Sequence, residues 1–390
     1  MEKFFKKIKT EFKEKIELQG KIEEFNQQTE RYREVFEVLY SRFMFCLSDL
    51  VESEKKKEKP EEWRGKIKEN KEMEKISREM EKSLDDIEVK QEKIIKEISE
   101  KIVTGYKQKE NELTNELKRK GEIDKKFTKN FFSELGIFPF DFLPPTFLEK
   151  IFQEVINKSI EKYKDTDYDS RSFSLFLSFL INKSVQEHFS KRGKETGSLI
   201  IHLDLSKLPK PLRDFGYKNS GKCYLLIEGN LDGYLGREMN GGVIKIKGNP
   251  GDRAGSRMID GYLEIEGDAQ SVGHFMSGGE IRIVKGKTEA AGEGMKGGYI
   301  VIEGDAGDLS GLRMEGGYLE IKGDAGKNTG LFMRGGVLEI RGNVKGFDKS
   351  VFSPENRGVV IWRKVRIFED GRFTKEGWKM MKEGEIPFSL

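Results

Sequence analysis

The chain has 390 residues, which is more than a single hydrophobic core usually supports, so the length predicts two or more domains. Its 71 Lys and Arg residues nearly balance its 68 Asp and Glu residues, which argues against a strongly basic nucleic-acid-binding domain. No apolar run is long enough to span a bilayer, the first residues carry charge instead of an apolar leader, and two cysteines cannot form a disulfide framework. We therefore expect a cytoplasmic protein without membrane association. Its many Lys and Glu residues, with few Cys and His, are typical of proteins from hot environments.

Residues 1–125 are rich in Lys and Glu, and their apolar residues recur every three or four positions. That spacing places an apolar stripe along one side of a helix. One stripe lies within 18–50, a charged break ends at Pro60, and a second stripe lies within 76–117 before a stop signal at Gly121. Two long helices with a short break predict an antiparallel coiled-coil hairpin. The hairpin would be either a solvated spacer or a docking arm for a partner, and the sequence leaves both open.

Residues 126–195 form a second region, in which aromatic residues cluster. Thr146 follows a Pro-Pro pair and suits the first turn of a helix that continues to about Tyr163. A further helix is expected from Ser172 to about Phe189. We interpret this region as a small helical module whose aromatic residues form its core, and which joins the arm to the rest of the chain.

From residue 223 onward the chain repeats one short unit, in which a glycine position precedes alternating aliphatic and polar residues. The copies span 223–229, 241–248, 261–267, 278–283, 297–304, 316–323 and 335–342. The anchor glycines Gly242, Gly261, Gly279, Gly298, Gly317 and Gly336 are 19, 18, 19, 19 and 19 residues apart, and Cys223 takes the glycine position of the first copy. Three residues before the anchors lie Met239, Met258, Met276, Met295, Met314 and Met333. Six residues before them lie Gly236, Gly255, Gly273, Gly292, Gly311 and Gly330.

One such unit contains a single short strand and cannot form a core alone, but stacked copies would place equivalent strands about 4.8 Å apart and bury the aliphatic columns. The spacing therefore predicts a parallel β-helix of about seven coils over residues 196–350, with a C-terminal cap over 351–390. Glycines would occupy turns that need a positive φ, and the methionines would point inward as adaptable filler.

An additional column of Asn and Asp residues follows the strands, at Asn230, Asn249, Asp268, Asp305, Asp324 and Asn343. One such residue per coil, half of them Asn, supplies too few carboxylates for a dedicated calcium site. We expect these side chains to cap tight turns. No metal-ligating, cofactor-binding or catalytic residue is predicted.

The pattern Gly-x-x-Met-x-Gly-Gly-aliphatic-x-Ile-x-Gly, as in 311–323, resembles the GXGXG repeat family over about residues 223–344. That family includes the C-terminal β-helix domain of the glutamate synthase large subunit and one of the subunits of formylmethanofuran dehydrogenase. The resemblance implies a right-handed β-helix that serves as a structural and assembly element, while the chemistry belongs to other domains or subunits. It carries no catalytic residue over to this chain. The chain lacks amidotransferase, flavin and iron–sulfur domains, and its helical arm is foreign to both relatives.

Both ends of a solenoid need a cover, because an open coil exposes strand edges and apolar columns. Residues 198–205 are expected to form a covering strand at the N-terminal end. At the other end, we expect a strand over 358–368 and a short amphipathic helix over 375–382. Trp362 and Trp378 are expected in the core of this cap.

The motifs of common catalytic and nucleotide-binding sites do not occur, and three histidines are too scattered to suggest an acid–base or metal cluster. The leading hypothesis is a non-catalytic scaffold or assembly protein that presents the β-helix and the arm to protein partners or to a second copy of itself. The resemblance alone supports an alternative, an accessory subunit of a redox or one-carbon enzyme complex. Basic stretches at 55–57 and 118–120 leave a nucleic-acid- or ribosome-associated factor as a further alternative.

Overall fold

A computed structural model describes residues 20–44 apart from 22, 26, 29, 32, 36 and 43, and then residues 71–120, 145–163, 169–191 and 198–389. The predicted break at Pro60 and stop at Gly121 lie outside the described residues. The chain divides into two compact units. The described residues of the first unit are those within 20–44 and 71–101, and the second unit holds the remainder, so the boundary falls within a long helix.

The first unit is helical in all its described residues, as the apolar periodicity predicted. It contains the helical segment within 20–44 and the first part of α3 (Lys71–Lys120), a continuous helix of 50 residues. Phe25, Ile76 and Ile98, which belong to the predicted stripes, are buried. Side-chain contacts join the described residues of these segments: Lys21 Nζ donates to Glu97 (3.2 Å), and Lys90 Nζ donates to Gln28 Oε1 (2.9 Å).

The second unit begins with the end of α3, followed by α5 (Pro145–Tyr163) and α6 (Ser170–Lys191), close to the predicted bounds. Tyr106 of α3 is buried against Phe173 and Phe176 of α6, with ring centroids 5.5 and 4.6 Å apart. The hydroxyls of Thr114 and Ser172 also share a hydrogen bond of 2.9 Å. Phe147, Phe152, Phe173 and Phe176 are buried, which confirms the predicted core for these four residues, whereas Phe179 is only partly buried. The aromatic residues expected between 127 and 142 lie outside the described residues.

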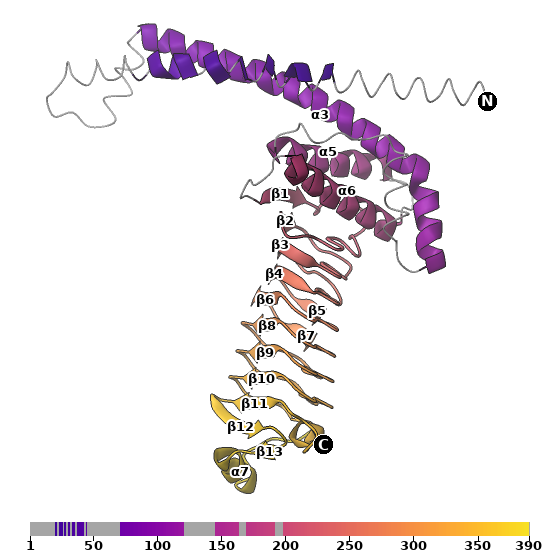
Figure 1. The fold of residues 1–390 in the computed structure, drawn as a ribbon, viewed down its shortest axis with the longest axis vertical. Helices are drawn as coiled ribbons and strands as arrows, with labels where there is room; N and C mark the ends of the chain where they lie inside the picture. Colours follow the sequence, from indigo (N-terminus) through magenta and orange to yellow (C-terminus); the bar gives the residue numbers. More distant parts are fainter. Residues whose placement is uncertain are drawn as a thin grey trace, which may run out of the picture. The chain divides into compact units, whose positions relative to one another are not determined.

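The remainder of the second unit is a β-solenoid, which confirms the predicted β-helix of about seven coils (Figure 1). The strands in chain order are β1 (Leu199–Asp204), β2 (Cys223–Glu228), β3 (Asn240–Lys247), β4 (Asp260–Glu266), β5 (Ala269–Val272), β6 (Glu280–Lys285), β7 (Thr288–Ala291), β8 (Tyr299–Ile302), β9 (Tyr318–Ile321), β10 (Val337–Ile340), β11 (Val359–Trp362), β12 (Val365–Glu369) and β13 (Arg372–Phe373). In the described part of the chain, the larger sheet has eleven strands in the order β1-β2-β3-β4-β6-β8-β9-β10-β11-β12-β13.

The strands from β1 to β11 are parallel, and those of the repeat pair with the residue 18 or 19 positions on, as the anchor spacing predicted: Tyr224 with Val243, and Tyr299 with Tyr318. The ladder continues past the repeat at both ends, where Leu199 pairs with Cys223 and Val337 pairs with Val359. On another side of two neighbouring coils, β5 and β7 form a second, smaller sheet.

Columns of equivalent side chains fill the solenoid interior. All six methionines of the repeat are at most 2% exposed, and the aliphatic residues of the strands lie beside them. The methionines also explain why the anchor position of the following coil is glycine. A Cβ added to Gly317, whose φ is +82°, would lie 2.5 Å from Met295 Cε and 2.9 Å from the carbonyl oxygen of Gly298. The regular spacing of Met and Gly along this chain thus reflects one contact between neighbouring coils.

The Asn and Asp column does not cap turns within its own coil. Its side chains instead bond to the next coil: the backbone N–H of Asp268 donates to Asn249 Oδ1 (2.9 Å), and the backbone N–H of Asn343 donates to Asp324 Oδ1 (2.7 Å). Only one acceptor oxygen is used, and Asn and Asp both supply it, which is why either residue type can occupy the column.

Helices close the N-terminal end of the solenoid, so β1 is the first rung of the ladder rather than its cover. The Gln153 side chain of α5 accepts from the backbone N–H of Asp204 (2.8 Å) and donates to its carbonyl (3.2 Å), as a neighbouring strand would. On α6, Ser178 Oγ accepts from the Gly216 N–H (2.9 Å) and Asn182 donates to the Tyr217 carbonyl (3.0 Å).

The C-terminal end is closed by a small cap. The segment expected as one strand is two antiparallel strands, β11 and β12, because Arg363 and Lys364 form a turn with φ of 51° and 65°. The helix α7 (Lys375–Lys382) follows as predicted. The tail then returns to the solenoid, where the Phe347 N–H donates to the Pro387 carbonyl (2.8 Å) and the Ser389 N–H donates to the Phe347 carbonyl (2.9 Å).

The two tryptophans of this cap differ. Trp362 is buried and its indole N–H donates to the Gly342 carbonyl (3.0 Å), so its predicted place in the core is correct. Trp378 of α7 is 49% exposed, although its ring centroid lies 5.8 Å from that of Phe373. The prediction of a core position for Trp378 is therefore wrong.

Candidate functional site

In the described parts of the chain, His, Cys, Asp and Glu side chains form no group of three or more that could hold a metal ion. The oxygens of the Asn and Asp column are occupied by backbone N–H groups of the next coil. Cys223, the first residue of β2, is buried, and burial raises the pKa of its thiol to about 12. A thiol with this pKa stays protonated at neutral pH and is a poor nucleophile. The other cysteine, Cys46, lies outside the described residues.

His202 and His274 each approach one carboxylate. His202 of β1 lies 3.4 Å from Glu228, and both side chains are nearly half exposed. His274 lies 3.6 Å from Glu293, and burial lowers the pKa of its imidazole although Glu293 opposes that shift. The remaining histidine, His188, belongs to α6.

Asp252 lies one coil before Ser271 and His274. A serine, an aspartate and a histidine are the residue types of a common nucleophilic catalytic site. Their hydrogen bonds do not support that chemistry. Ser271 Oγ donates to Asp252 Oδ1 (2.5 Å) and accepts from the backbone N–H of Arg253 (3.1 Å). Because the hydroxyl proton points to a carboxylate rather than to an imidazole, no general base is positioned to activate the serine.

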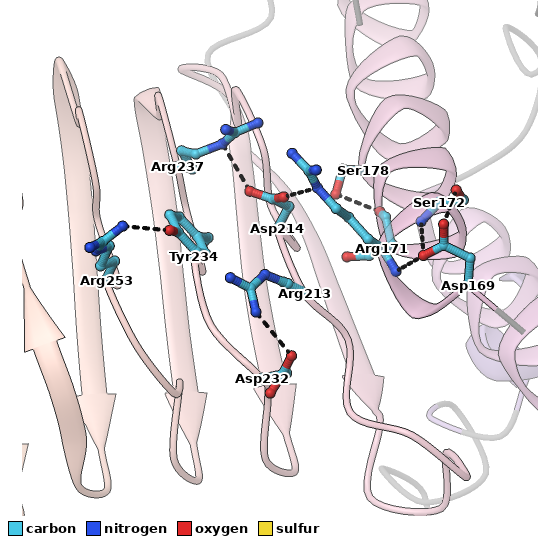
Figure 2. A network of polar contacts seen from close by, with 11 residues as sticks. Asp169, Arg171, Ser172, Ser178, Arg213, Asp214, Asp232, Tyr234, Arg237 and Arg253 are labelled. Atoms are coloured by element: carbon cyan, nitrogen blue, oxygen red, sulfur yellow. Dashed lines mark hydrogen bonds and ion pairs between the residues drawn. The ribbon is translucent and has the colours of Figure 1, made fainter. Parts of the chain in front are cut away.

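The most connected polar cluster lies where α6 meets the first coils (Figure 2). Asp214 is 2% exposed and forms ion pairs with Arg171 Nε of α6 (2.6 Å) and with Arg237 Nε of the next coil (2.8 Å). Asp169 holds the start of α6, since it accepts from the backbone N–H of Arg171 (3.0 Å) and from the Ser172 hydroxyl (2.9 Å). One buried carboxylate therefore links the helical module to two coils of the solenoid.

Two tyrosines extend this cluster along the solenoid. The ring of Tyr234 lies between Arg213 and Arg253, whose guanidinium carbons are 4.9 and 5.8 Å from its centre, and Arg253 also donates to the Tyr234 hydroxyl (2.8 Å). Tyr217 lies under Arg237, at 4.7 Å. Every charged group of the cluster has a partner within the chain. The cluster therefore fits a structural joint better than a ligand site.

A different surface of the solenoid presents large apolar and charged side chains to solvent. The residue that precedes each methionine from the second to the sixth of the repeat is exposed or is glycine, and these five positions form what we call the exposed column: Arg257, Phe275, Gly294, Arg313 and Phe332. All five have a positive φ, between 51° and 60°. Phe275 and Phe332 are 44% and 53% exposed.

The comparisons with known proteins do not assign the chain to a family: no protein-family model and no curated protein sequence matches it. Of the helices in the described residues, none is both long enough and apolar enough to cross a membrane.

The sequence patterns predicted no site residue, and they indicated neither the polar joint nor the exposed column. The joint has no local signal, because Arg171, Asp214 and Arg237 come from three different segments. The exposed column did have a signal. Its positions adjoin the methionine column, and large or charged residues recur there beside a buried position.

Proposed function

We propose that the chain is a non-catalytic scaffold or assembly protein of the cytoplasm, which presents its solenoid and its helical arm to protein partners. The observation that carries this proposal is the use of the repeat. The methionine, aliphatic and Asn or Asp columns serve contacts with the next coil. The polar cluster at the N-terminal end likewise joins parts of the chain to one another.

The closure of both solenoid ends supports the same proposal. Gln153 bonds to the backbone of Asp204 in β1 at one end, and the tail around Ser389 bonds to the last coil at the other. Strand edges that are capped in this way do not favour end-to-end polymerisation. Partners would therefore bind along the side of the solenoid or on the arm.

We further propose that the arm is an antiparallel coiled-coil hairpin. The contacts Lys21–Glu97 and Gln28–Lys90 support it, because residue numbers increase on one helix as they decrease on the other. The burial of Phe25, Ile76 and Ile98 fits an apolar seam between the two helices.

Affinity purification of the full-length tagged protein from its native cells tests the proposed function. We expect a protein partner at near-stoichiometric yield, retained after washing at moderate salt. Native mass spectrometry of the eluate then separates hetero-complexes from copies of this chain. Recovery of the free monomer alone would contradict the proposal. A catalytic partner protein would favour the narrower role that the GXGXG resemblance implies, an accessory component of an enzyme complex.

A further inference from the structure

The exposed column forms a continuous row along the solenoid, because its members are joined coil to coil. The backbone N–H of Arg257 donates to the His274 carbonyl, that of Phe275 to the Glu293 carbonyl, and that of Arg313 to the Leu331 carbonyl, each at 2.8 Å. With about 4.8 Å per coil, the row from Arg257 to Phe332 extends over roughly 19 Å. Its chemical order along this length is cation, aromatic ring, glycine, cation, aromatic ring.

The conformation of these positions favours glycine, yet only one of the five is glycine. L-residues rarely adopt a positive φ, and a bulky side chain makes that conformation less favourable still. At Gly294 the backbone meets this demand without strain, and the ring of Phe275 covers the space where a Cβ would lie. Phe332 has a φ of 55° and remains 53% exposed, so its side chain gains little burial in return for the strained backbone.

The arginines of the column also lack a side-chain partner among the described residues. Arg257 and Arg313 are exposed and form no ion pair or hydrogen bond through their side chains with any residue that the structure describes, and the same holds for Arg334, two positions after Phe332. On the strand face of the same coils, cations are paired across neighbouring strands, as in Lys245–Glu264 and Lys322–Glu303. Free arginines beside exposed aromatic rings are typical of protein-binding surfaces.

We propose that the exposed column binds an extended acidic segment of a partner protein, with carboxylates on Arg257 and Arg313 and apolar side chains on Phe275 and Phe332. The two arginines are three coils apart, as are the two phenylalanines, which corresponds to roughly 14 Å. Residues four positions apart in an extended peptide point the same way and are separated by about the same distance. The segment would therefore repeat an acidic and an apolar residue every four positions.

Carboxylates close to the column favour a peptide over a nucleic acid. Glu293 precedes Gly294, in a coil between those of the two arginines, so a continuous phosphate chain would meet negative charge there. Glu315, two residues after Arg313, adds a carboxylate at one end of that stretch. A peptide can place its own carboxylates opposite the arginines alone. Ile259, which is 53% exposed beside Arg257, likewise fits an apolar side chain.

Fluorescence anisotropy with the full-length protein tests this inference. The probe is a labelled peptide of three Glu-Ser-Phe-Ser repeats, and a single-stranded oligothymidylate of similar length is the comparison. We expect Arg313→Glu and Phe332→Gly each to weaken peptide binding by about tenfold or more. The Phe332→Gly variant should melt at the same or a higher temperature, because glycine removes the backbone strain, so a loss of binding in it does not reflect unfolding.

Matched controls lie on other faces of the solenoid. Lys345→Glu reverses a charge at an exposed position, and Tyr299→Ser removes a ring that is 59% exposed on the strand face. Both should bind the peptide within about twofold of the wild type. Absence of peptide binding at about 1 mM, or equal binding by the column and control variants, would overturn the inference. The inference would also be overturned if the oligothymidylate bound more tightly than the peptide and the column variants abolished that binding.

This inference rests on the proposed scaffold function, and the two can fail separately. Affinity purification repeated with Phe332→Gly distinguishes them. If the wild type and the variant recover the same partner at equal yield, the scaffold function stands and the exposed column is not the binding surface. If the wild type recovers no partner, the scaffold function itself is contradicted.

Discussion

Replacement of Gly317 by Ala tests the contact between the methionine of one coil and the anchor glycine of the next. The added Cβ would lie 2.5 Å from Met295 Cε and 2.9 Å from the Gly298 carbonyl oxygen, at a φ of +82°. The positive φ alone costs an alanine about 1 kcal/mol, and the crowding of a closely packed interior adds about 1–3 kcal/mol. We therefore expect Gly317→Ala to lower the free energy of unfolding by about 2–4 kcal/mol.

Gly384→Ala is the matched control. Gly384 has a φ of +72°, and no heavy atom lies within 4 Å of the position of an added Cβ, so only the conformational cost of about 1 kcal/mol remains. Urea unfolding followed by circular dichroism measures both variants, and hydrogen exchange shows whether protection is lost in the coils around Gly317. Equal destabilisation by the two substitutions would refute the proposed contact.

A double-mutant cycle identifies the methionine as the partner. Met295→Ala should cost about 2–5 kcal/mol alone, because it leaves a cavity in the interior. It also removes the methyl group against which the added Cβ of Gly317→Ala would press. The double variant should therefore be more stable than the sum of the single effects by about 1 kcal/mol. Strict additivity would show that Met295 does not cover Gly317.

Three further predictions concern the solenoid and its joint. Asp324→Asn should leave the stability nearly unchanged, whereas Asp324→Ala should lower the free energy of unfolding by about 1 kcal/mol because the Asn343 N–H loses its acceptor. Equal destabilisation by the two variants would show that the charge of Asp324 matters instead. Asp214→Asn should cost about 3 kcal/mol in urea unfolding, since Arg171 and Arg237 lose their shared counter-charge, and a change within error would make the joint unimportant. Burial raises the pKa of the Cys223 thiol to about 12, so Cys223 should resist alkylation by iodoacetamide at about pH 8 in the native protein and react once the protein is unfolded. Alkylation of Cys223 in the native state, detected by peptide mass spectrometry, would contradict its burial.

The repeated coils could be predicted from the sequence because each coil meets the same surroundings as its neighbours. The spacing of Met295, Met314 and their anchors determines the register of the strands between them, and that register is confirmed. The rungs at the two ends were harder to predict. β1 and β11 lie outside the regular spacing, and Arg363 and Lys364 form a tight turn without the Gly, Asn or Asp that usually signals one.

Contacts between coils could not be predicted where the residue type favours a partner within a few residues in the sequence. An Asp such as Asp324 often caps a turn within a few residues, but here its partner is the backbone of Asn343 in the next coil. The pairing of Asp214 with Arg171 joins a helix to a coil 43 residues away, and no local pattern reports such a contact. Trp378 was expected in the core because tryptophan is usually buried, but its ring lies beside Phe373 and Lys382 and remains 49% exposed.

Stacking of the repeats into one parallel solenoid is the central claim, and a distance across several coils tests it most directly. In a Cys46→Ser background, spin labels at Lys245→Cys and Glu339→Cys occupy equivalent outward positions that the strand register separates by five rungs. At about 4.8 Å per rung, electron–electron double resonance should give a narrow distribution centred near 24 Å. A broad distribution centred beyond about 40 Å would contradict the solenoid, because only unstacked units would separate these positions that far.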